Sequence, residues 1–345
     1  MRQVPRIVVV KLVALGDVVM ASTLVEAVRN RWPDAHLTWV TGQDLAPLVS
    51  RFDGVDEVIA IDDRALLRGR PLARASALIH AWRSIGRGPW TLGIVAHTDR
   101  RYGSLLWTTR ANEVRYFRNG KLPRGTRRGV WMGAEYARLV EDDAKPPAVA
   151  PRLARLREVD GATASGEGEP AGVLLAPGGA RNIVHEQHLR RWPVSSWVQL
   201  ARSLWESGEK VTLIGGDFDA AEGAQIEHEV PGVKNLIGRT TLEQLLGRIR
   251  TARLLITHDS GPLHLAALTR TPTVALFGPT SPQERIESGA VTVVATAAPQ
   301  LACAPCYDGF RYAPCALNRC LTEVSAEQVL QLARPFLRAP QEQSG

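Results

Sequence analysis

Short apolar runs alternate with helical segments along most of the chain, and this alternation constrains the fold more than any other feature. The main runs lie at 6–12, 36–41, 55–61, 90–96, 172–176, 210–214, 252–256 and 273–277. Most of them precede a stretch in which apolar residues recur at helical spacing, as at 13–28 and 257–268. Consecutive parallel strands need a crossover connection, which a helix usually supplies. The alternation therefore predicts an α/β protein with parallel sheets and right-handed crossovers.

A change of composition in the middle of the chain predicts two domains. Residues 141–170 are rich in proline, glycine, small and acidic residues, which is typical of a linker with an exposed loop. We place the boundary between 150 and 170. The predicted domains are residues 1–155 and residues 156–345, each a doubly wound Rossmann-like unit, and we expect them to face each other across a cleft. A chain of 345 residues is long enough for two such cores.

Composition narrows the compartment. The chain is 45% hydrophobic and 22% charged, as in ordinary soluble proteins. No stretch approaches the roughly 20 apolar residues that span a bilayer. The N-terminal residues 1–5 lead directly into an apolar run without a small-residue cleavage site, so this run predicts a first strand and not a signal peptide. We therefore expect a cytoplasmic protein.

The segment 257–266, with the sequence THDSGPLHLA, joins a predicted strand to a predicted helix. Its polar turn lies at the carboxyl end of the strand, where parallel α/β sheets bind their ligands. Asp259, Ser260 and Gly261 stand at the start of the helix, whose free N–H groups and dipole favour an anion such as phosphate. Asp and Ser also suit an ordinary helix cap, and His264 also suits helix packing. The segment predicts either a phosphate site or a capped helix.

Asp17 occupies the corresponding place in the first domain. Gly16 permits a turn after the strand at 6–12, and Asp17 opens the helix that follows. Its carboxylate is either a functional acid at the ligand-binding edge of the sheet or a plain helix cap.

Basic residues are concentrated in one part of a chain whose formal net charge is +7 and whose isoelectric point is about 9.6. The cluster consists of Arg100, Arg101, Arg110, Arg115, Arg118, Lys121, Arg124, Arg127 and Arg128. It is either a solvated face or a patch for an acidic partner, and its density favours a partner. We expect no nucleic acid as that partner, because the cluster contains no known nucleic-acid-binding module.

The four cysteines all lie near the C-terminus, at Cys303, Cys306, Cys315 and Cys320. A cytoplasmic chain keeps its thiols reduced, so this spacing is more typical of a metal knuckle than of a disulfide framework. It fits no standard zinc module. The pattern therefore leaves two readings, a structural zinc or iron site and free thiols.

Five motifs together resemble one family. They are Val10-Lys11 with Leu15-Gly16-Asp17, Ala176-Pro177-Gly178, Arg191-Trp192-Pro193, Thr257 to His264, and Phe277-Gly278-Pro279-Thr280. In this order, and over residues from about 7 to 338, the sequence is similar to the lipopolysaccharide heptosyltransferases of glycosyltransferase family 9. The resemblance implies the GT-B fold, in which two Rossmann-like domains form the enzyme.

The resemblance also implies a reaction. Heptose would pass from ADP-L-glycero-D-manno-heptose to the inner core of lipopolysaccharide, with inversion at the anomeric carbon and with no cofactor or divalent metal. Asp17 matches the family's catalytic base. The donor would be bound by Gly16, Gly178, Arg190, Glu222, Asp259, Ser260, Gly261 and His264. The acceptor, a phosphorylated lipid-linked oligosaccharide, would meet Arg100, Arg101, Arg118 and Lys121, with peripheral contact on the inner face of the inner membrane.

Some positions depart from the family pattern or leave a choice open. Arg190 stands where the family commonly has lysine, and arginine binds phosphate through two parallel hydrogen bonds where lysine acts as a point charge. Either Glu222 or Asp219 would supply the acid that contacts the donor ribose. A GT-B transferase for another nucleotide sugar or a non-lipopolysaccharide glycan, and a nucleotide-sugar-binding protein without catalysis, are the alternative functions.

Overall fold

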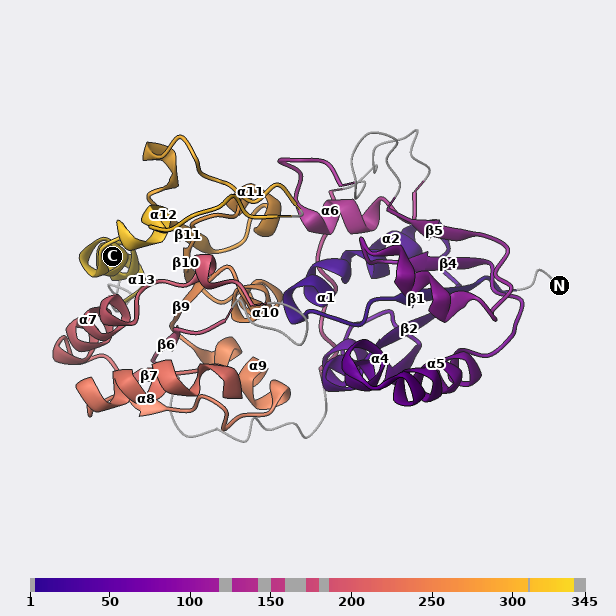
Figure 1. The fold of residues 1–345 in the computed structure, drawn as a ribbon, viewed down its shortest axis with the longest axis horizontal. Coiled ribbons are helices and arrows are strands. Elements are labelled where there is room, and N and C mark those ends of the chain that lie inside the picture. Colours follow the sequence, from indigo (N-terminus) through magenta and orange to yellow (C-terminus); the bar gives the residue numbers. More distant parts are fainter. Residues whose placement is uncertain are drawn as a thin grey trace, which may run out of the picture. The chain divides into compact units, whose positions relative to one another are not determined.

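The computed structural model divides into two compact units, Met1–Val159 and Asp160–Gly345, and each contains its own parallel sheet (Figure 1). The structure describes residues 4–117, 126–141, 150–158, 172–179, 186–309 and 311–337. The predicted boundary after residue 155 falls close to this division. The acceptor and donor roles assigned to the two units remain predictions.

Unit 1 has a five-stranded sheet in the order β3-β2-β1-β4-β5. Its strands are β1 (Arg6–Val10), β2 (His36–Gly42), β3 (Glu57–Ile61), β4 (Leu92–Val95) and β5 (Val114–Tyr116). Its helices are α1 (Leu15–Ala21), α2 (Thr23–Arg31), α3 (Ala46–Ser50), α4 (Asp63–Arg68), α5 (Pro71–Ile85), α6 (Met132–Ala137) and the 3-10 helices η1 (Gln43–Leu45) and η2 (Arg100–Leu106). The apolar run of β1 is buried at four consecutive positions, because a central parallel strand is covered on both faces.

Unit 2 has a six-stranded parallel sheet in the order β11-β10-β9-β6-β7-β8. Its strands are β6 (Val173–Ala176), β7 (Val211–Leu213), β8 (Lys234–Asn235), β9 (Leu254–His258), β10 (Thr273–Leu276) and β11 (Thr292–Ala295). Its helices are α7 (Val194–Glu206), α8 (Ala220–Glu229), α9 (Leu242–Thr251), α10 (Gly261–Thr269), α11 (Pro282–Arg285), α12 (Arg319–Thr322), α13 (Ala326–Leu337) and the 3-10 helices η3 (His188–Arg190), η4 (Asp217–Asp219) and η5 (Ala298–Gln300). The prediction of two Rossmann-like α/β units is confirmed.

The strand orders mark where a ligand would bind in each unit. In unit 1, β1 pairs with both β2 and β4, and in unit 2, β6 pairs with both β7 and β9. The chain therefore leaves the middle of each sheet in two directions, and loops diverge beyond the carboxyl ends of β1 and β4 and of β6 and β9. Ligands of open parallel sheets bind at such switch points. The predicted segment 257–266 begins at the switch point of unit 2.

Two separate helices occupy residues 63–85. Helix α4 ends at Arg68 and α5 begins at Pro71. Proline disfavours helical dihedrals in the preceding residue, and Arg70 is extended, with φ −63° and ψ 160°. The break lets α5 start in a new direction.

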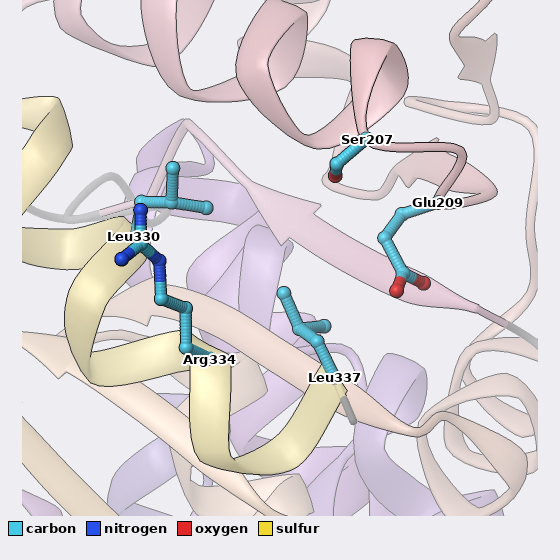
Figure 2. Close-up of a pocket in the computed structure, with 5 residues that line it drawn as sticks. All are labelled: Ser207, Glu209, Leu330, Arg334 and Leu337. Atoms are coloured by element: carbon cyan, nitrogen blue, oxygen red, sulfur yellow. The ribbon is translucent and has the colours of Figure 1, made fainter. Parts of the chain in front are cut away.

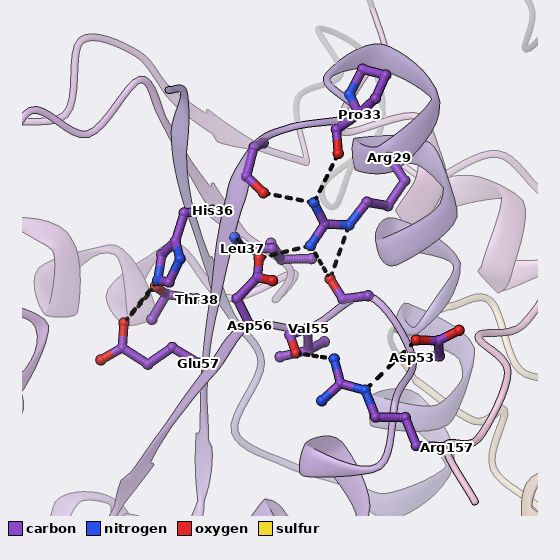
Figure 3. Close-up of polar contacts among 12 residues, drawn as sticks. Arg29, Pro33, His36, Leu37, Thr38, Asp53, Val55, Asp56, Glu57 and Arg157 are labelled. Carbon is purple, nitrogen blue, oxygen red and sulfur yellow. Dashed lines mark hydrogen bonds and ion pairs between the residues drawn. The ribbon is translucent and has the colours of Figure 1, made fainter. Parts of the chain in front are cut away.

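A network of polar contacts fixes the connection between β2 and β3 (Figure 3). Arg29 donates to the carbonyl oxygens of Gly54 and Ala35 and pairs with Asp56 at 2.7 Å. Burial disfavours the charge on Asp56, but hydrogen bonds from the Leu37 N–H and from Arg29 outweigh it and hold the pKa of Asp56 below its ordinary value. This network holds the edge of the sheet opposite to the predicted site.

Residues 150–158 return to unit 1 after the first-unit helices. Arg157 donates to the Val55 carbonyl at 2.7 Å, and Leu156 forms an isolated antiparallel bridge with Phe52.

Among the described residues, no helix combines the length and hydrophobicity that crossing a bilayer requires.

Candidate functional site

Asp259 is the centre of a buried charge cluster at the carboxyl end of β9. One Asp259 carboxylate oxygen, Oδ2, lies 3.0 Å from Arg190 Nη2 and 3.8 Å from Arg285 Nε, and it accepts a hydrogen bond from the Thr280 hydroxyl at 2.8 Å. Its other oxygen, Oδ1, lies 3.8 Å from His264 Nε2. Burial penalises the charge, but Arg190, His264 and Arg285 together hold the pKa of Asp259 far below its ordinary value. The carboxylate is ionised at all physiological pH values.

Two buried polar atoms in this cluster lack a hydrogen-bond partner among the described residues. They are Asp259 Oδ1 and Arg190 Nε. A buried donor or acceptor without a partner costs about 1–3 kcal/mol. Such atoms at a sheet switch point are therefore what a site for a polar ligand would offer.

The start of α10 lies beside this cluster, and Ser260 is its N-cap residue without capping it through the side chain. The Ser260 hydroxyl lies 3.1 Å from Thr257 Oγ1 instead. The Ser260 side chain is therefore not an ordinary cap of α10. The dipole of a nine-residue helix begins at Gly261 and favours an anion there.

His258, the last residue of β9, joins three segments of the site. Its Nε2 accepts a hydrogen bond from the Trp192 N–H at 2.8 Å, and its Nδ1 lies 2.9 Å from the Gly178 carbonyl oxygen. Because Nε2 accepts, Nδ1 must carry the proton and donate it to Gly178. Burial lowers the pKa of His258 to about 4, so the imidazole is neutral and fits this tautomer. The sequence analysis missed this role, since a histidine in an apolar strand also suits a core position.

The loop after β6 approaches the same place through glycine. A side chain at Gly178 would place its Cβ 1.9 Å from Asp219 Cγ, so only glycine fits. The Asp219 carboxylate accepts hydrogen bonds from the N–H groups of Gly179 and Gly216, each at 3.0 Å. Asp219 thus ties two glycine loops together with both of its oxygens. Contact of Glu222 or Asp219 with a donor ribose stays a prediction.

Glu222 and the neighbouring Arg191 form a second charged group. Arg191 donates to the Gly179 carbonyl at 3.1 Å and lies 3.5 Å from Glu222 and 3.3 Å from Glu186. Glu222 stands in the first turn of α8 and is partly buried. Arg191 therefore fixes the loop that carries Arg190 to Asp259.

Thr280 and Arg285 belong to the cluster, although the sequence analysis gave neither a site role. Thr280 follows β10, the strand that pairs with β9, and Arg285 ends the short helix α11. The guanidinium of Arg285 also lies over the Tyr307 ring, 5.8 Å from its centroid. The motif Gly278-Pro279-Thr280 was the available signal for Thr280. Nothing in the local sequence signals Arg285.

In unit 1, Asp17 lies in the first turn of α1, at the switch point between β1 and β4. Ala14 is the N-cap of this helix, so Asp17 is not its cap. The Asp17 side chain is 39% exposed, and its Oδ2 lies 3.3 Å from the buried Nζ of Lys11. A positive charge at this distance favours the carboxylate form. Gly16 precedes Asp17 within the same helical turn.

Two further titratable groups, His97 and Asp63, lie at the same edge of the unit 1 sheet. His97 accepts a hydrogen bond from the Leu12 N–H at 2.9 Å and stacks on Tyr102, with ring centroids 3.7 Å apart. Burial, with a contribution from Lys11, lowers the pKa of His97 well below its ordinary value. Asp63 is buried against Gly42, and burial raises its pKa. The edge therefore combines ionised and neutral groups, an arrangement typical of active sites.

The predicted acceptor residues are only partly described. Arg118 and Lys121 lie outside the described residues, and for Arg100 the backbone alone is described, as the first residue of η2. Arg101 forms an exposed pair with Asp99 at 2.7 Å. Within the wider cluster, Arg115 donates to the Val140 carbonyl at 2.7 Å and so stabilises the end of the segment that contains α6. Contact of this cluster with an acceptor remains a prediction.

The four cysteines are free thiols in the structure, and Cys320 alone is buried. Burial, followed by the neighbouring thiols Cys306, Cys315 and Cys303, raises the pKa of Cys320 to about 11. Among the described residues, no group of three or more His, Cys, Asp or Glu side chains is placed to hold a metal ion. The expectation of a structural zinc or iron therefore has no support in this geometry, and the spacing alone had suggested it.

The cysteine segment nevertheless borders the charge cluster. The Tyr307 N–H donates to the Pro279 carbonyl at 2.9 Å, and the rings of Tyr307 and Tyr312 lie 4.6 Å apart. Burial raises the pKa of Tyr312; the charge of Arg190 lowers this pKa in part, and the charge of Asp259 raises it further. The segment thus forms one wall beside Asp259.

Two Rossmann-like units in one chain form the GT-B fold, which solved heptosyltransferase structures share. A structure of Escherichia coli ADP-heptose lipopolysaccharide heptosyltransferase II has this fold, with a TM-score of 0.70 and 21% identity over 96% of this chain and 98% of that one. An iron-containing dodecameric glycosyltransferase from enterotoxigenic E. coli matches with a TM-score of 0.59 and 14% identity, over 97% of this chain and 77% of that one.

Sequence comparison finds similar proteins in one family. Residues 171–311 match the model of glycosyltransferase family 9 (heptosyltransferase). Lipopolysaccharide heptosyltransferase 2 of E. coli K12 is 27% identical over 294 residues, which cover 78% of this chain and 81% of that protein. Residues 171–311 are thus similar to glycosyltransferase family 9, and most of the chain is similar to lipopolysaccharide heptosyltransferase 2.

Proposed function

We propose that this protein transfers heptose from ADP-heptose to an acceptor in the inner core of lipopolysaccharide. The observation that carries the proposal is the buried cluster of Arg190, Asp259 and Arg285 at the β6/β9 switch point, beside the start of α10. Two guanidinium groups lie within 3.8 Å of one carboxylate oxygen, and guanidinium groups are suitable ligands for a phosphate. The relatives named above are heptosyltransferases, and one of them uses ADP-heptose by name.

The donor diphosphate would bind at the start of α10. Backbone N–H groups of Ser260 and Gly261 and the guanidinium of Arg190 are suitable phosphate ligands. His264, one turn further along α10, would lie beside the diphosphate. Asp259 Oδ1, which lies 3.8 Å from His264 and makes no hydrogen bond among the described residues, would accept a hydrogen bond from a hydroxyl of the heptose. Gly178 and Glu222 would lie towards the nucleoside.

Asp17 is the proposed catalytic base. Its carboxylate, 3.3 Å from Lys11 Nζ, would take the proton from the acceptor hydroxyl as the oxygen attacks the anomeric carbon. A single direct displacement of ADP would invert that carbon. The negative charge that develops on ADP would be stabilised by the arginines and the helix start, so no divalent metal is needed for the step. The proposal assigns acceptor activation to unit 1 and donor binding to unit 2.

The residues that would bind the acceptor are proposed in less detail. A phosphorylated, lipid-linked oligosaccharide carries negative charge, and Arg100, Arg101, Arg118 and Lys121 are the basic residues assigned to it. Such an acceptor is held in a membrane, so the enzyme would work from the cytoplasm at the inner face of the inner membrane.

Asp17→Asn tests the base assignment, with Asp44→Asn as the control on an exposed carboxylate of the same unit. We expect Asp17→Asn to bind ADP as the wild type does in calorimetry, while turnover falls about 10²–10⁴-fold. Asp44→Asn should leave both unchanged, and chelation of divalent metal should not slow the wild type. Wild-type turnover by Asp17→Asn would show that another group is the base.

A further inference from the structure

Residues 64–98 carry a one-sided charge. This stretch contains six arginines and no aspartate or glutamate, although the whole chain has 35 acidic residues. The arginines are Arg64, Arg68, Arg70, Arg74, Arg83 and Arg87. All six are exposed. The stretch forms α4, α5 and β4 with their connections, and α4 and α5 are labelled together in unit 1 in Figure 1.

These arginines are scarcely neutralised. Arg64 pairs with Asp44 at 2.7 Å, and Arg74 donates to the Leu67 carbonyl. None of the five arginines other than Arg64 pairs with a carboxylate among the residues that the structure describes. The positive charge therefore faces solvent. This is unlike Arg115 and Arg101, whose charges are met by Glu113 and Asp99.

Large apolar side chains are exposed on the same surface. Leu72 is 87% exposed and Ile79 is 43% exposed. They are seven residues apart on α5 and so lie on one face of the helix, with Arg83 one turn further along that face. A surface helix normally turns such residues inwards, and here Ala77, Ala81 and Ile85 form the buried face instead.

Trp107, just after η2, extends the apolar strip. Its ring is 77% exposed and packs edge-on against Trp82 of α5, with centroids 5.7 Å apart. The Trp82 indole N–H donates to the Ser104 carbonyl at 2.7 Å and so fixes η2 on α5. A cavity of about 450 Å³ opens beside Trp107 and is lined also by Arg110 and Tyr116. We call residues 63–87, which contain α4 and α5, together with Trp107 the α5 surface.

We propose that the α5 surface docks on a membrane that contains anionic phospholipid. Its exposed Leu72 and Ile79 suit the acyl boundary, its Trp107 suits the interface, and its arginines suit phosphate headgroups. A nucleic acid or an acidic protein would meet the arginines but would leave the aliphatic side chains without a partner. This inference rests on the proposed function, because docking on a membrane would bring the enzyme to its lipid-linked acceptor.

The position of the surface fits that purpose. Helix η2 starts directly after Asp99, and its Tyr102 stacks on His97 at the edge that carries Asp17. Helix α4 starts at Asp63 on the same edge. A membrane held against the α5 surface would therefore bring its lipid-linked sugars next to the proposed base.

Co-sedimentation of the full chain with vesicles tests the proposal. Neutral phosphatidylcholine vesicles are compared with vesicles in which a third of the lipid is phosphatidylglycerol. We expect binding to the anionic vesicles only, weakened by salt, and weakened about fivefold by each of Arg83→Gln and Arg87→Gln. Leu72→Ser combined with Ile79→Ser should weaken it at least tenfold. The controls in unit 2, Arg250→Gln and Leu317→Ser, should change binding less than twofold.

Three results would overturn the proposal. They are equal binding to both kinds of vesicle, equal effects of the α5-surface and control variants, and binding of the wild type to RNA in preference to vesicles. Transfer to an acceptor without acyl chains separates this inference from the proposed function. If transfer is normal and vesicle binding ignores the variants, the docking surface is wrong while the function stands. If vesicles bind as expected and ADP-heptose gives no transfer, the function is wrong.

Discussion

His258 gives the most quantitative prediction, because both of its ring nitrogens hydrogen-bond to the backbone of the proposed donor site. We consider His258→Gln, which keeps a polar side chain of similar length but cannot gain a proton. At neutral pH it can satisfy at most one of the two groups that His258 joins, the Trp192 N–H and the Gly178 carbonyl. The free energy of unfolding should therefore fall by about 1–3 kcal/mol, the cost of one buried group left without a partner.

The pH dependence follows from the pKa of His258, which burial lowers from 6.5 to about 4 in the folded chain. Above pH 6.5 the imidazole is neutral in both states and contributes no pH dependence. As the pH falls from 6.5 towards 4, the unfolded chain binds a proton at His258 and the folded chain does not. The free energy of unfolding therefore falls. The loss is about 1.4 kcal/mol per pH unit and roughly 3 kcal/mol in all. His258→Gln lacks this loss, so its deficit against the wild type should close or reverse near pH 4.

Urea unfolding at a series of pH values measures this difference, with fragment mass spectrometry after brief proteolysis to follow unit 2 separately from unit 1. His228→Gln, on the exposed surface of α8 in the same unit, is the matched control and should run parallel to the wild type. Parallel curves for wild type and His258→Gln from pH 7.5 to 4 would refute the neutral, doubly bonded histidine.

Three further predictions concern the charge cluster and the glycine loops. Thr280→Val removes the hydroxyl that donates to Asp259 at 2.8 Å, so it should cost about 1.5–3 kcal/mol of unfolding free energy in urea titrations, while Thr280→Ser costs little. Arg190→Ala should weaken ADP binding at least tenfold in calorimetry and leave adenosine binding unchanged, since it acts on the phosphates; equal losses for both ligands would contradict this. Asp219→Ala leaves the N–H groups of Gly179 and Gly216 without their acceptor, so hydrogen exchange at both should quicken, and unchanged exchange would show that Asp219 does not tie the loops.

The sequence predicted the fold well because the signals for it are local. Apolar runs of five to seven residues and helical spacing between them are read from neighbouring positions, and they marked most of the parallel strands of both units. The same holds for Asp259 and Ser260, which follow a strand directly. The helix break between Arg68 and Pro71 also has a local cause, which is Pro71.

The parts of the site that were missed depend on which strands are neighbours. Arg285 reaches Asp259 because β10 pairs with β9, and no local pattern reports that pairing. Asp219 serves two loops that are distant in sequence, so spacing could not separate it from Glu222. The cysteines show the opposite failure, since their spacing suggested a metal site that the described geometry does not support.

The central claim is that this chain moves a heptose from ADP to a core oligosaccharide. The most direct test is mass spectrometry of a truncated inner-core acceptor after incubation with the purified protein and ADP-heptose, with UDP- and GDP-sugars in parallel. The account predicts the mass gain of one heptose from ADP-heptose alone, in the inverted anomeric configuration. Transfer from UDP- or GDP-sugars in preference, or no transfer while ADP still binds at the cluster around Asp259, would contradict it.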